Sequence, residues 1–257
     1  MRDPHVVALR YRLVQDEYTK FEEPPPLDWE EDDFLLHLEN NVATASMKVH
    51  FDSVEKAREI VDFRLRAWEL DVALAQHGRA EIRFEFDRAE VVDRDPPPPG
   101  APQVVKPDPL KVEVKVSAFL SAHVIRKTYP GPPSRFTASL DVEVTWLRYE
   151  GYRRGKEPLA AMAYFCLTVV EARGGRKKVA KELNIEPELL RKLGELSSNV
   201  GDPREARKLS GSGRAHTDRE KKWLEAMVLA LIRRLGEYDF DPTAKLTTVT
   251  MADLPNL

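Results

Sequence analysis

The stretch TDREKKWLEAMVLALIRRLGE, residues 217–237, is the most clearly marked structural element in the sequence. Thr217 can cap a helix, and Glu220 three residues later completes a capping box. The apolar residues that follow share one stripe at helical spacing, namely Trp223, Met227, Leu231 and Leu235. Gly236 is expected to end the helix, because glycine commonly follows a helix C-terminus. This amphipathic helix predicts a helical C-terminal half.

Four shorter helices are expected before it, over residues 141–152, 159–172, 176–183 and 187–196. Residues 159–172 are mostly apolar, so their helix should lie at the centre of its domain. The first segment also fits a strand, since Val142, Val144 and Trp146 alternate along the chain. The helical period fits the longer stretch, and we therefore expect an all-α bundle.

The N-terminal half shows the alternation that is typical of strands. Residues 6–14 alternate loosely, and residues 34–51 predict two short strands around the turn-prone pair Asn40–Asn41. Residues 80–86 alternate again, with three apolar side chains on one face. These patterns predict antiparallel strands.

One long helix should interrupt these strands. Asp52 can cap it, and Glu55 follows at the spacing of a capping box. Its apolar residues recur at helical spacing, namely Val54, Ala57, Ile60, Val61, Leu65, Trp68, Val72 and Ala75. The helix should stop near Gly78, and the N-terminal half is therefore expected to be a mixed α/β domain.

Proline-rich segments divide the chain. Pro96–Pro99 and Gly100 exclude a helix or a central strand, so residues 94–110 should form a stiff surface loop. Residues 116–125 are apolar and fit either a buried strand or a short helix. A second proline cluster, Pro130–Pro133, marks a domain boundary. The expected fold class is α+β, with a mixed α/β domain over residues 1–135, a helical domain over 136–240 and a tail over 241–257.

Charge is unevenly distributed over the chain, whose net charge is −3. Residues 151–240 hold 19 Lys or Arg against 13 Asp or Glu, whereas the first 150 residues carry a net charge of −8. This asymmetry predicts either an anionic partner for the C-terminal half or attraction between the two halves. Hydrophobic residues make up 42% of the chain, which suffices for a packed core and excludes an intrinsically disordered protein.

Several functional classes lack their motifs. The six histidines are scattered, and there is no Walker loop, GxGxxG or GxSxG, so neither a metal site nor a cofactor is expected. His50 and His123 are expected to be satisfied core histidines in or beside strands. Cys166, the only cysteine, lies in an apolar run, which predicts a buried thiol in a reducing compartment. Without a signal peptide or a stretch of ~18 apolar residues, we expect a cytoplasmic protein with no membrane partner.

The segment RKKVAKELNIEPELLRKL, residues 176–193, has the turn and core spacing of a helix-turn-helix. In that motif the second helix would enter the major groove of DNA. That helix carries several carboxylates beside its two basic residues, Arg191 and Lys192, and carboxylates repel phosphate. We favour the alternative of an ordinary helix pair within a bundle.

The segment NVGDPREARKLSGSGRAHT, residues 199–217, is the second candidate site. Its basic residues are Arg204, Arg207, Lys208, Arg214 and His216, around the flexible Ser210, Gly211, Ser212 and Gly213. Arginines bind phosphate through two hydrogen bonds, glycines allow close approach, and the free N–H groups at the start of the following helix favour anions. A loop that binds RNA or a nucleotide is therefore expected, with a solvated mobile loop as the alternative.

Three parts of the C-terminal hundred residues resemble the HEPN superfamily of helical bundles. They are the apolar helix with Ala161–Cys166, the helix pair through Arg191–Gly194, and the final helix Trp223–Glu237. The whole chain also resembles a bacterial protein family without an assigned activity. The resemblance implies an all-α bundle. HEPN domains commonly form dimers and often cleave RNA without a metal, in toxin–antitoxin and antiviral systems.

The catalytic motif of HEPN nucleases is an arginine, four to six residues and then a histidine. Here eight residues separate Arg207 from His216, and one residue separates Arg214 from His216. We therefore expect a binding or regulatory module that contacts RNA, a nucleotide or a protein partner, with homodimer formation through the C-terminal helices.

Two alternatives remain open. In a divergent metal-independent HEPN ribonuclease, His216 would act as general acid or base, and Arg207 or Arg214 would stabilise the charged transition state. In a DNA-binding regulator, residues 176–193 would bind DNA with an affinity that falls steeply with salt.

Overall fold

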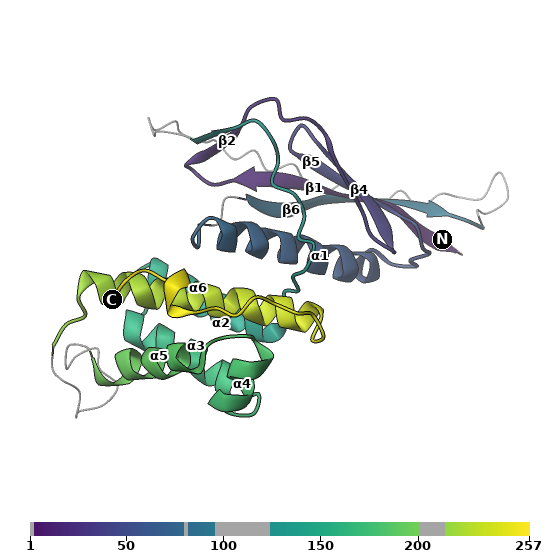
Figure 1. Ribbon diagram of the computed structural model, residues 1–257. Helices are drawn as coiled ribbons and strands as arrows, with labels where there is room; N and C mark the ends of the chain where they lie inside the picture. Colours follow the sequence, from purple (N-terminus) through teal and green to yellow (C-terminus); the bar gives the residue numbers. More distant parts are fainter. Residues whose placement is uncertain (1–2, 80–81, 96–123, 201–213) are drawn as a thin grey trace. The chain divides into compact units, whose positions relative to one another are not determined.

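The computed structural model describes residues 3–79, 82–95, 124–200 and 214–257 (Figure 1). The chain divides into two compact units. The sheet unit comprises Met1–Glu69 and Ala80–Pro132, and the helical unit comprises Leu70–Arg79 and Pro133–Leu257. Helices and an antiparallel sheet are both present, which confirms the predicted α+β class.

The sheet unit contains an antiparallel sheet with the strand order β3-β4-β5-β1-β6. Its strands are β1 Pro4–Gln15, β3 Leu27–Glu30, β4 Phe34–Glu39, β5 Val42–Met47 and β6 Ile82–Asp93. Two short strands, β2 Thr19–Phe21 and β7 Val124–Arg126, pair in parallel. The antiparallel strands predicted for this half are therefore confirmed.

The β4–β5 hairpin follows directly from its sequence. Phe34, Leu36 and Leu38 are fully buried, whereas the residues between them are exposed. The turn residues Asn40 and Asn41 both have positive φ, 50° and 60°. Asparagine tolerates this conformation in a two-residue hairpin turn, so the predicted pair of strands is confirmed.

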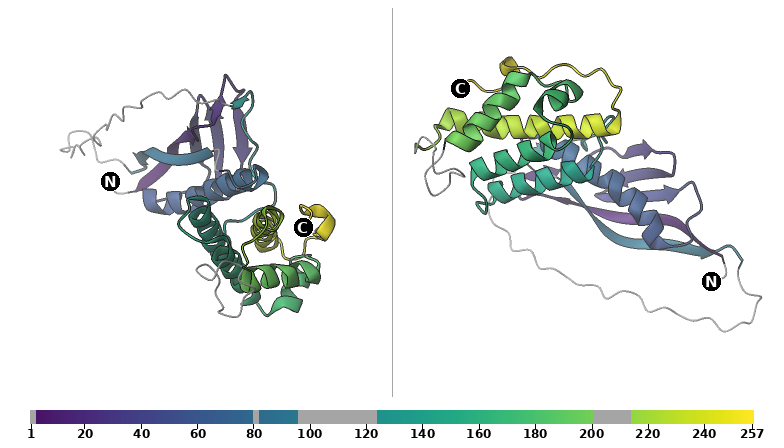
Figure 2. Two further views of the ribbon diagram at one scale, coloured as in Figure 1. Left: turned by 90° about the vertical axis from the view of Figure 1, so that its left-hand side faces the viewer. Right: turned by 90° about the horizontal axis from the view of Figure 1, so that it is seen from below.

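Helix α1, Val54–Ala75, lies against one face of the sheet (Figure 2). Its N-terminus corrects one prediction, because the Oγ of Ser53 accepts the backbone N–H of Lys56 at 3.3 Å. Asp52 instead accepts the Nζ of Lys56 at 2.8 Å. The capping residue of a helix accepts a backbone N–H from two or three residues further along the chain. Ser53 makes this contact and Asp52 does not, so Ser53 caps α1. The helix ends as predicted, with Gly78 at a φ of +83°.

The described part of the helical unit contains five α-helices besides the end of α1. They are α2 Leu140–Arg153, α3 Leu159–Glu171, α4 Arg176–Glu182, α5 Pro187–Asn199 and α6 Asp218–Phe240. Ser139 caps α2, which is a helix throughout although its sequence also alternates. Helix α3 contacts α2, α4, α5 and α6, so the prediction that it lies at the centre is confirmed.

Helix α6 begins as predicted and ends later than predicted. The capping box of Thr217 and Glu220 is present. The helix nevertheless continues past Gly236 to Phe240, so the prediction that Gly236 ends it is wrong. A Cβ on Gly236 would overlap the ring of Phe136. This glycine therefore serves close packing and not helix termination.

An ionic clamp joins the start of α2, the segment just after α3 and the end of α6. The Nε of Arg173 donates to Asp141 at 2.7 Å, and its two terminal nitrogens donate to the carboxylate oxygens of Asp239 at 2.7 Å each. Ser139 donates to the same Asp239 at 2.5 Å. Two parallel hydrogen bonds between guanidinium and carboxylate are the strong geometry for this pair. The clamp therefore fixes α2 against α6.

Residues 241–257, predicted as a separate tail, belong to the helical unit. Val249 forms a parallel β-bridge with Ile185 in the α4–α5 turn. Arg234 donates to the backbone oxygen of Thr247 at 2.5 Å, and Leu254 is buried. These contacts hold the segment on the bundle.

The remaining predictions about single residues have mixed outcomes. Cys166 is buried as predicted, and burial raises the pKa of its thiol to about 12. His50 is not a core residue, because its side chain is exposed and stacks on His5 with ring centroids 5.1 Å apart. It lies in the loop between β5 and α1, where the sheet has already ended. His123 lies outside the described residues.

No helix in the described part of the chain is long and apolar enough to cross a membrane.

Candidate binding face of the helical unit

The predicted anion-binding loop is only partly described by the structure. The residues outside the described ranges are Arg204, Arg207, Lys208, Ser210, Gly211, Ser212 and Gly213. Arg214 and His216 lie within them, directly before α6. The roles that the sequence suggests for these nine residues remain predictions.

Arg214 belongs to the start of α6. Its guanidinium donates to both carboxylate oxygens of Glu220, at 2.7 and 2.5 Å. Glu220 also accepts the backbone N–H of Thr217 at 2.8 Å. Arg214 lowers the pKa of Glu220 to about 2, against the opposing effect of burial. The charge that was expected to face a phosphate is thus already neutralised within the chain.

His216 connects the ends of two helices. Its Nε2 lies 3.1 Å from the backbone oxygen of Leu196 in α5. A carbonyl oxygen can only accept a hydrogen bond, so this Nε2 carries the proton. His216 is half-buried, and its position is set by this contact between α5 and the start of α6. A role in holding the bundle together accounts for this geometry.

Helix α5 carries the two basic residues that were predicted to contact DNA, Arg191 and Lys192. Arg191 donates to Glu188 at 2.7 Å and to Glu195 at 3.2 Å. Lys192 donates to Glu195 at 3.1 Å. The two basic residues that would bind DNA are therefore paired with carboxylates of their own helix, which weakens the attraction of α5 for phosphate.

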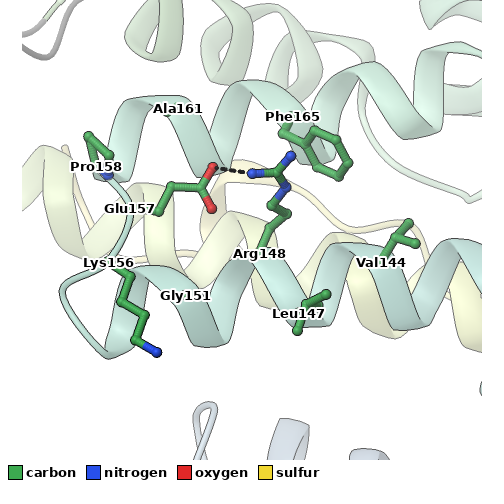
Figure 3. Close-up of a pocket in the computed structure, with 9 residues that line it drawn as sticks. All are labelled: Val144, Leu147, Arg148, Gly151, Lys156, Glu157, Pro158, Ala161 and Phe165. Carbon is green, nitrogen blue, oxygen red and sulfur yellow. Dashed lines mark hydrogen bonds and ion pairs between the residues drawn. The ribbon is translucent and has the colours of Figure 1, made fainter.

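A groove lies between α2 and α3 (Figure 3). It is open, with a volume of about 690 Å³. Its lining residues are Val144, Leu147, Arg148, Gly151, Lys156, Glu157, Pro158, Ala161 and Phe165. Most of this surface is apolar, and a Cβ added at Gly151 would meet only Glu157, at 3.5 Å. An apolar concave surface with few polar groups is typical of a binding site.

Arg148 crosses the groove from α2 toward α3, between Glu157 and Phe165 (Figure 3). Its Nη1 lies 3.2 Å from the Oε1 of Glu157, and its guanidinium lies 4.2 Å from the centre of the Phe165 ring. A cation over an aromatic ring contributes about 0.5–1 kcal/mol at an exposed site. These contacts hold the arginine in one orientation, so the groove presents a defined polar group within an apolar wall.

Two leucines on α2 point away from the bundle. Leu140 is 78% exposed and Leu147 is 66% exposed, which makes them the most exposed large hydrophobic residues in the described part of the chain. The buried face of the same helix is formed by Val142, Thr145, Trp146 and Tyr149. Helix α2 is thus apolar on two faces, and the described residues of this chain cover only one of them.

The exposed leucines belong to a regular stripe. Leu140, Val144, Leu147 and Gly151 follow one another at intervals of four, three and four residues. This is the a/d spacing of helices that pack against other helices in a coiled coil. We call these four residues the α2 stripe, and we call the stripe together with the groove the α2–α3 face. The sequence interpretation missed this face, although the spacing of the stripe was visible in it.

The described residues contain no group of three or more His, Cys, Asp or Glu side chains that could hold a metal ion. Comparison of the chain with protein-family models, curated proteins and solved structures gives no match. The HEPN-like character of the helical unit therefore stays a prediction, and the α2–α3 face has to be interpreted from its own geometry.

Proposed function

We propose that this protein is a binding module whose HEPN-like helical unit engages a protein partner through the α2–α3 face. The observation that carries the proposal is the exposure of Leu140 and Leu147 beside an apolar groove. Contiguous exposed apolar surface on a folded protein marks an interaction site.

The energetics favour a role in association over a role in folding. A leucine that is 66% or 78% exposed buries little of its side chain in the fold. Covering such a side chain with a partner would stabilise the complex by about 1.5–3 kcal/mol. Interfaces between helices are built from large apolar side chains that insert into spaces on the facing helix. Two leucines one heptad apart provide such side chains, and Gly151 provides such a space.

The alternative functions have less support. Arg214 and His216 both contact other parts of the chain, as described above, and a nuclease would require them to face the substrate. The basic residues of α5 are paired within the helix. The binding module is therefore better supported than the metal-independent ribonuclease or the DNA-binding regulator.

Site-specific photo-crosslinking tests the proposal. A photoreactive phenylalanine analogue would replace Leu147 in the full chain, expressed in cells that naturally produce the protein. The matched control carries the same analogue at Phe63, an exposed apolar residue of α1 that is 43% exposed. We expect a covalent protein adduct from position 147 and none from position 63.

A second substitution makes the crosslinking result specific. Leu140→Asp in the same chain should abolish the adduct, because it places a charge in the face without touching the crosslinking position. An adduct that survives this change, or equal adducts from both positions, would contradict the assignment of the α2–α3 face.

A further inference from the structure

The α2–α3 face has the shape that receives a helix. The groove lies between two helices that a short turn connects. Each helix contributes one apolar row to its walls, namely Val144 and Leu147 from α2 and Ala161 and Phe165 from α3. Rows with this spacing accept the side chains of a third helix between them. From Leu140 to Gly151 the α2 stripe runs about 16 Å, which corresponds to three turns of a partner helix.

The groove carries positive charge that the described part of the chain does not neutralise. Its lining contains two basic side chains, Arg148 and Lys156, and one carboxylate, Glu157. Arg148 already contacts that carboxylate at 3.2 Å. The side chain of Lys156 is exposed, extends from the turn between the two helices and forms no hydrogen bond or ion pair with the described residues (Figure 3). The lining therefore has one more cation than it has carboxylates.

Charge differs between the two ends of the α2–α3 face. Residues 140–147 of α2 include two acidic side chains and no basic one. The end of α2 and the turn after it carry three exposed basic residues, Arg153, Arg154 and Lys156. A carboxylate of a partner is attracted more strongly to this second end than to the first. The distribution of charge therefore favours one orientation of a bound helix, with its acidic end at Lys156.

The start of α3 lies at the same basic end. This helix has no side-chain cap at Pro158 and no acidic residue in its first turn. Glu157, which precedes it, is bound by Arg148. The free N–H groups at the start of a helix carry partial positive charge and favour a carboxylate. Their contribution has the same sign as that of Lys156, so both favour an acidic residue on the partner.

We propose that the α2–α3 face binds an amphipathic helix of another protein, with apolar residues three and four apart and a carboxylate at the end that meets Lys156. The inference rests on the proposed function, and it adds the chemistry and the orientation of the partner. Burial of apolar side chains along the α2 stripe would supply most of the affinity, and the charge pair would fix the register.

Mass spectrometry of the position-147 adduct identifies the partner segment. We expect the crosslinked peptide to have apolar residues at helical spacing over about three turns, with an Asp or Glu at one end. The protein that contains this peptide is then purified and mixed with the full wild-type chain for the two measurements that follow.

Carbodiimide coupling tests the charge pair directly. The reagent activates a carboxylate, a lysine amine in contact attacks the activated carbon, and an amide forms while the reagent leaves as a urea with the carboxylate oxygen. We expect an amide between the Nζ of Lys156 and an Asp or Glu of the crosslinked segment. Lys156→Arg is the matched control, because a guanidinium stays protonated and cannot be coupled. This variant should lose the amide while its dissociation constant stays within about twofold of the wild-type value.

Charge reversal measures what Lys156 contributes to binding. Lys156→Glu should raise the dissociation constant at least about fivefold, because it places like charges opposite each other. Lys177→Glu, at an exposed lysine of α4, makes the same change in net charge away from the face and should alter the constant less than about twofold. Isothermal titration calorimetry gives these constants, and urea unfolding of each variant is the control for folding.

Other outcomes separate this inference from the proposed function. A partner segment that lacks a carboxylate, or that leaves Lys156 uncoupled and binds Lys156→Glu equally well, would overturn the acidic helix and leave the binding module intact. An adduct with a second copy of this chain would also overturn the inference and leave the face as a binding site. The absence of any adduct from position 147 would overturn both proposals.

Discussion

Helices α2 and α6 both carry apolar stripes, but the two stripes differ in how much of their surface is buried. The α6 stripe of Trp223, Met227, Leu231 and Leu235 is completely buried. The α2 stripe lies on the surface, with Leu140 and Leu147 more than half exposed. Apolar spacing therefore predicts that a helix face will be covered, without specifying whether the same chain covers it. The difference places the α6 stripe in the core and leaves the α2 stripe for the protein partner that we propose above.

The largest expected effect is the contrast between two leucine truncations. Leu231→Ala in α6 should lower the unfolding free energy by about 2–5 kcal/mol, because it leaves a cavity in the core. Leu147→Ala in α2 should change it by less than about 0.5 kcal/mol at concentrations where the protein is monomeric. Urea denaturation of both variants measures the contrast. Equal losses would show that the α2 stripe is part of the fold.

Two glycines provide the next comparison. Gly236→Ala should destabilise the protein by about 1–3 kcal/mol, because the new methyl group overlaps the Phe136 ring. Gly151→Ala should stabilise the monomer by about 0.5–1 kcal/mol, because alanine favours the helix and nothing closer than 3.5 Å opposes it. The same Gly→Ala substitution should thus lower the stability of the protein in α6 and raise it in α2. Thermal denaturation distinguishes them, and a loss at Gly151 would mean that the groove is already filled.

A smaller effect concerns the start of α6. The pKa of Glu220 is about 2 in the folded chain, below its ordinary value of 4.5, chiefly because of Arg214. A lowered folded-state pKa stabilises the fold above about pH 4.5, and this stabilisation is lost as the pH falls toward about 2. The wild-type unfolding free energy should therefore fall more steeply between about pH 5 and 2 than that of Glu220→Gln. Parallel pH profiles would mean that the Arg214–Glu220 pair contributes nothing.

The last prediction is that the protein does not cleave RNA, so the His216→Ala substitution should have no effect in this assay. Metal-free incubation with labelled single-stranded RNA should leave the RNA intact with the wild type and with His216→Ala alike, because His216 serves the contact between α5 and α6. Cleavage by the wild type that the variant lacks would establish the ribonuclease and displace the binding module. Gel electrophoresis of the RNA decides between them.

Local rules explain which parts of the fold the sequence could predict. The Asn40–Asn41 turn and the Thr217–Glu220 capping box depend on residues that are adjacent in the sequence, and both were predictable. Helix α6 continues through Gly236, which packs against Phe136, a residue a hundred positions away, and no local pattern reveals that contact.

The candidate site was harder to predict than the fold. The sequence directs attention to charged residues before α6, and the structure shows two of them, Arg214 and His216, bound within the chain. The α2–α3 face depends on which side of α2 the other helices cover, and this is a property of tertiary packing. Only its heptad spacing was accessible beforehand, and that spacing is shared with core helices.

The clamp of Arg173 also has a consequence for how the bundle forms. Its partners Asp141 and Asp239 lie 32 and 66 residues away along the chain. Closing contacts of such long sequence separation is slow, since the loop entropy is lost before the contact is gained. Asp239 lies near the C-terminal end of α6, so the clamp can close only after nearly the whole helical unit has been synthesised. Until then the guanidinium has at most one carboxylate, and the nascent bundle remains open at the end where α2 begins.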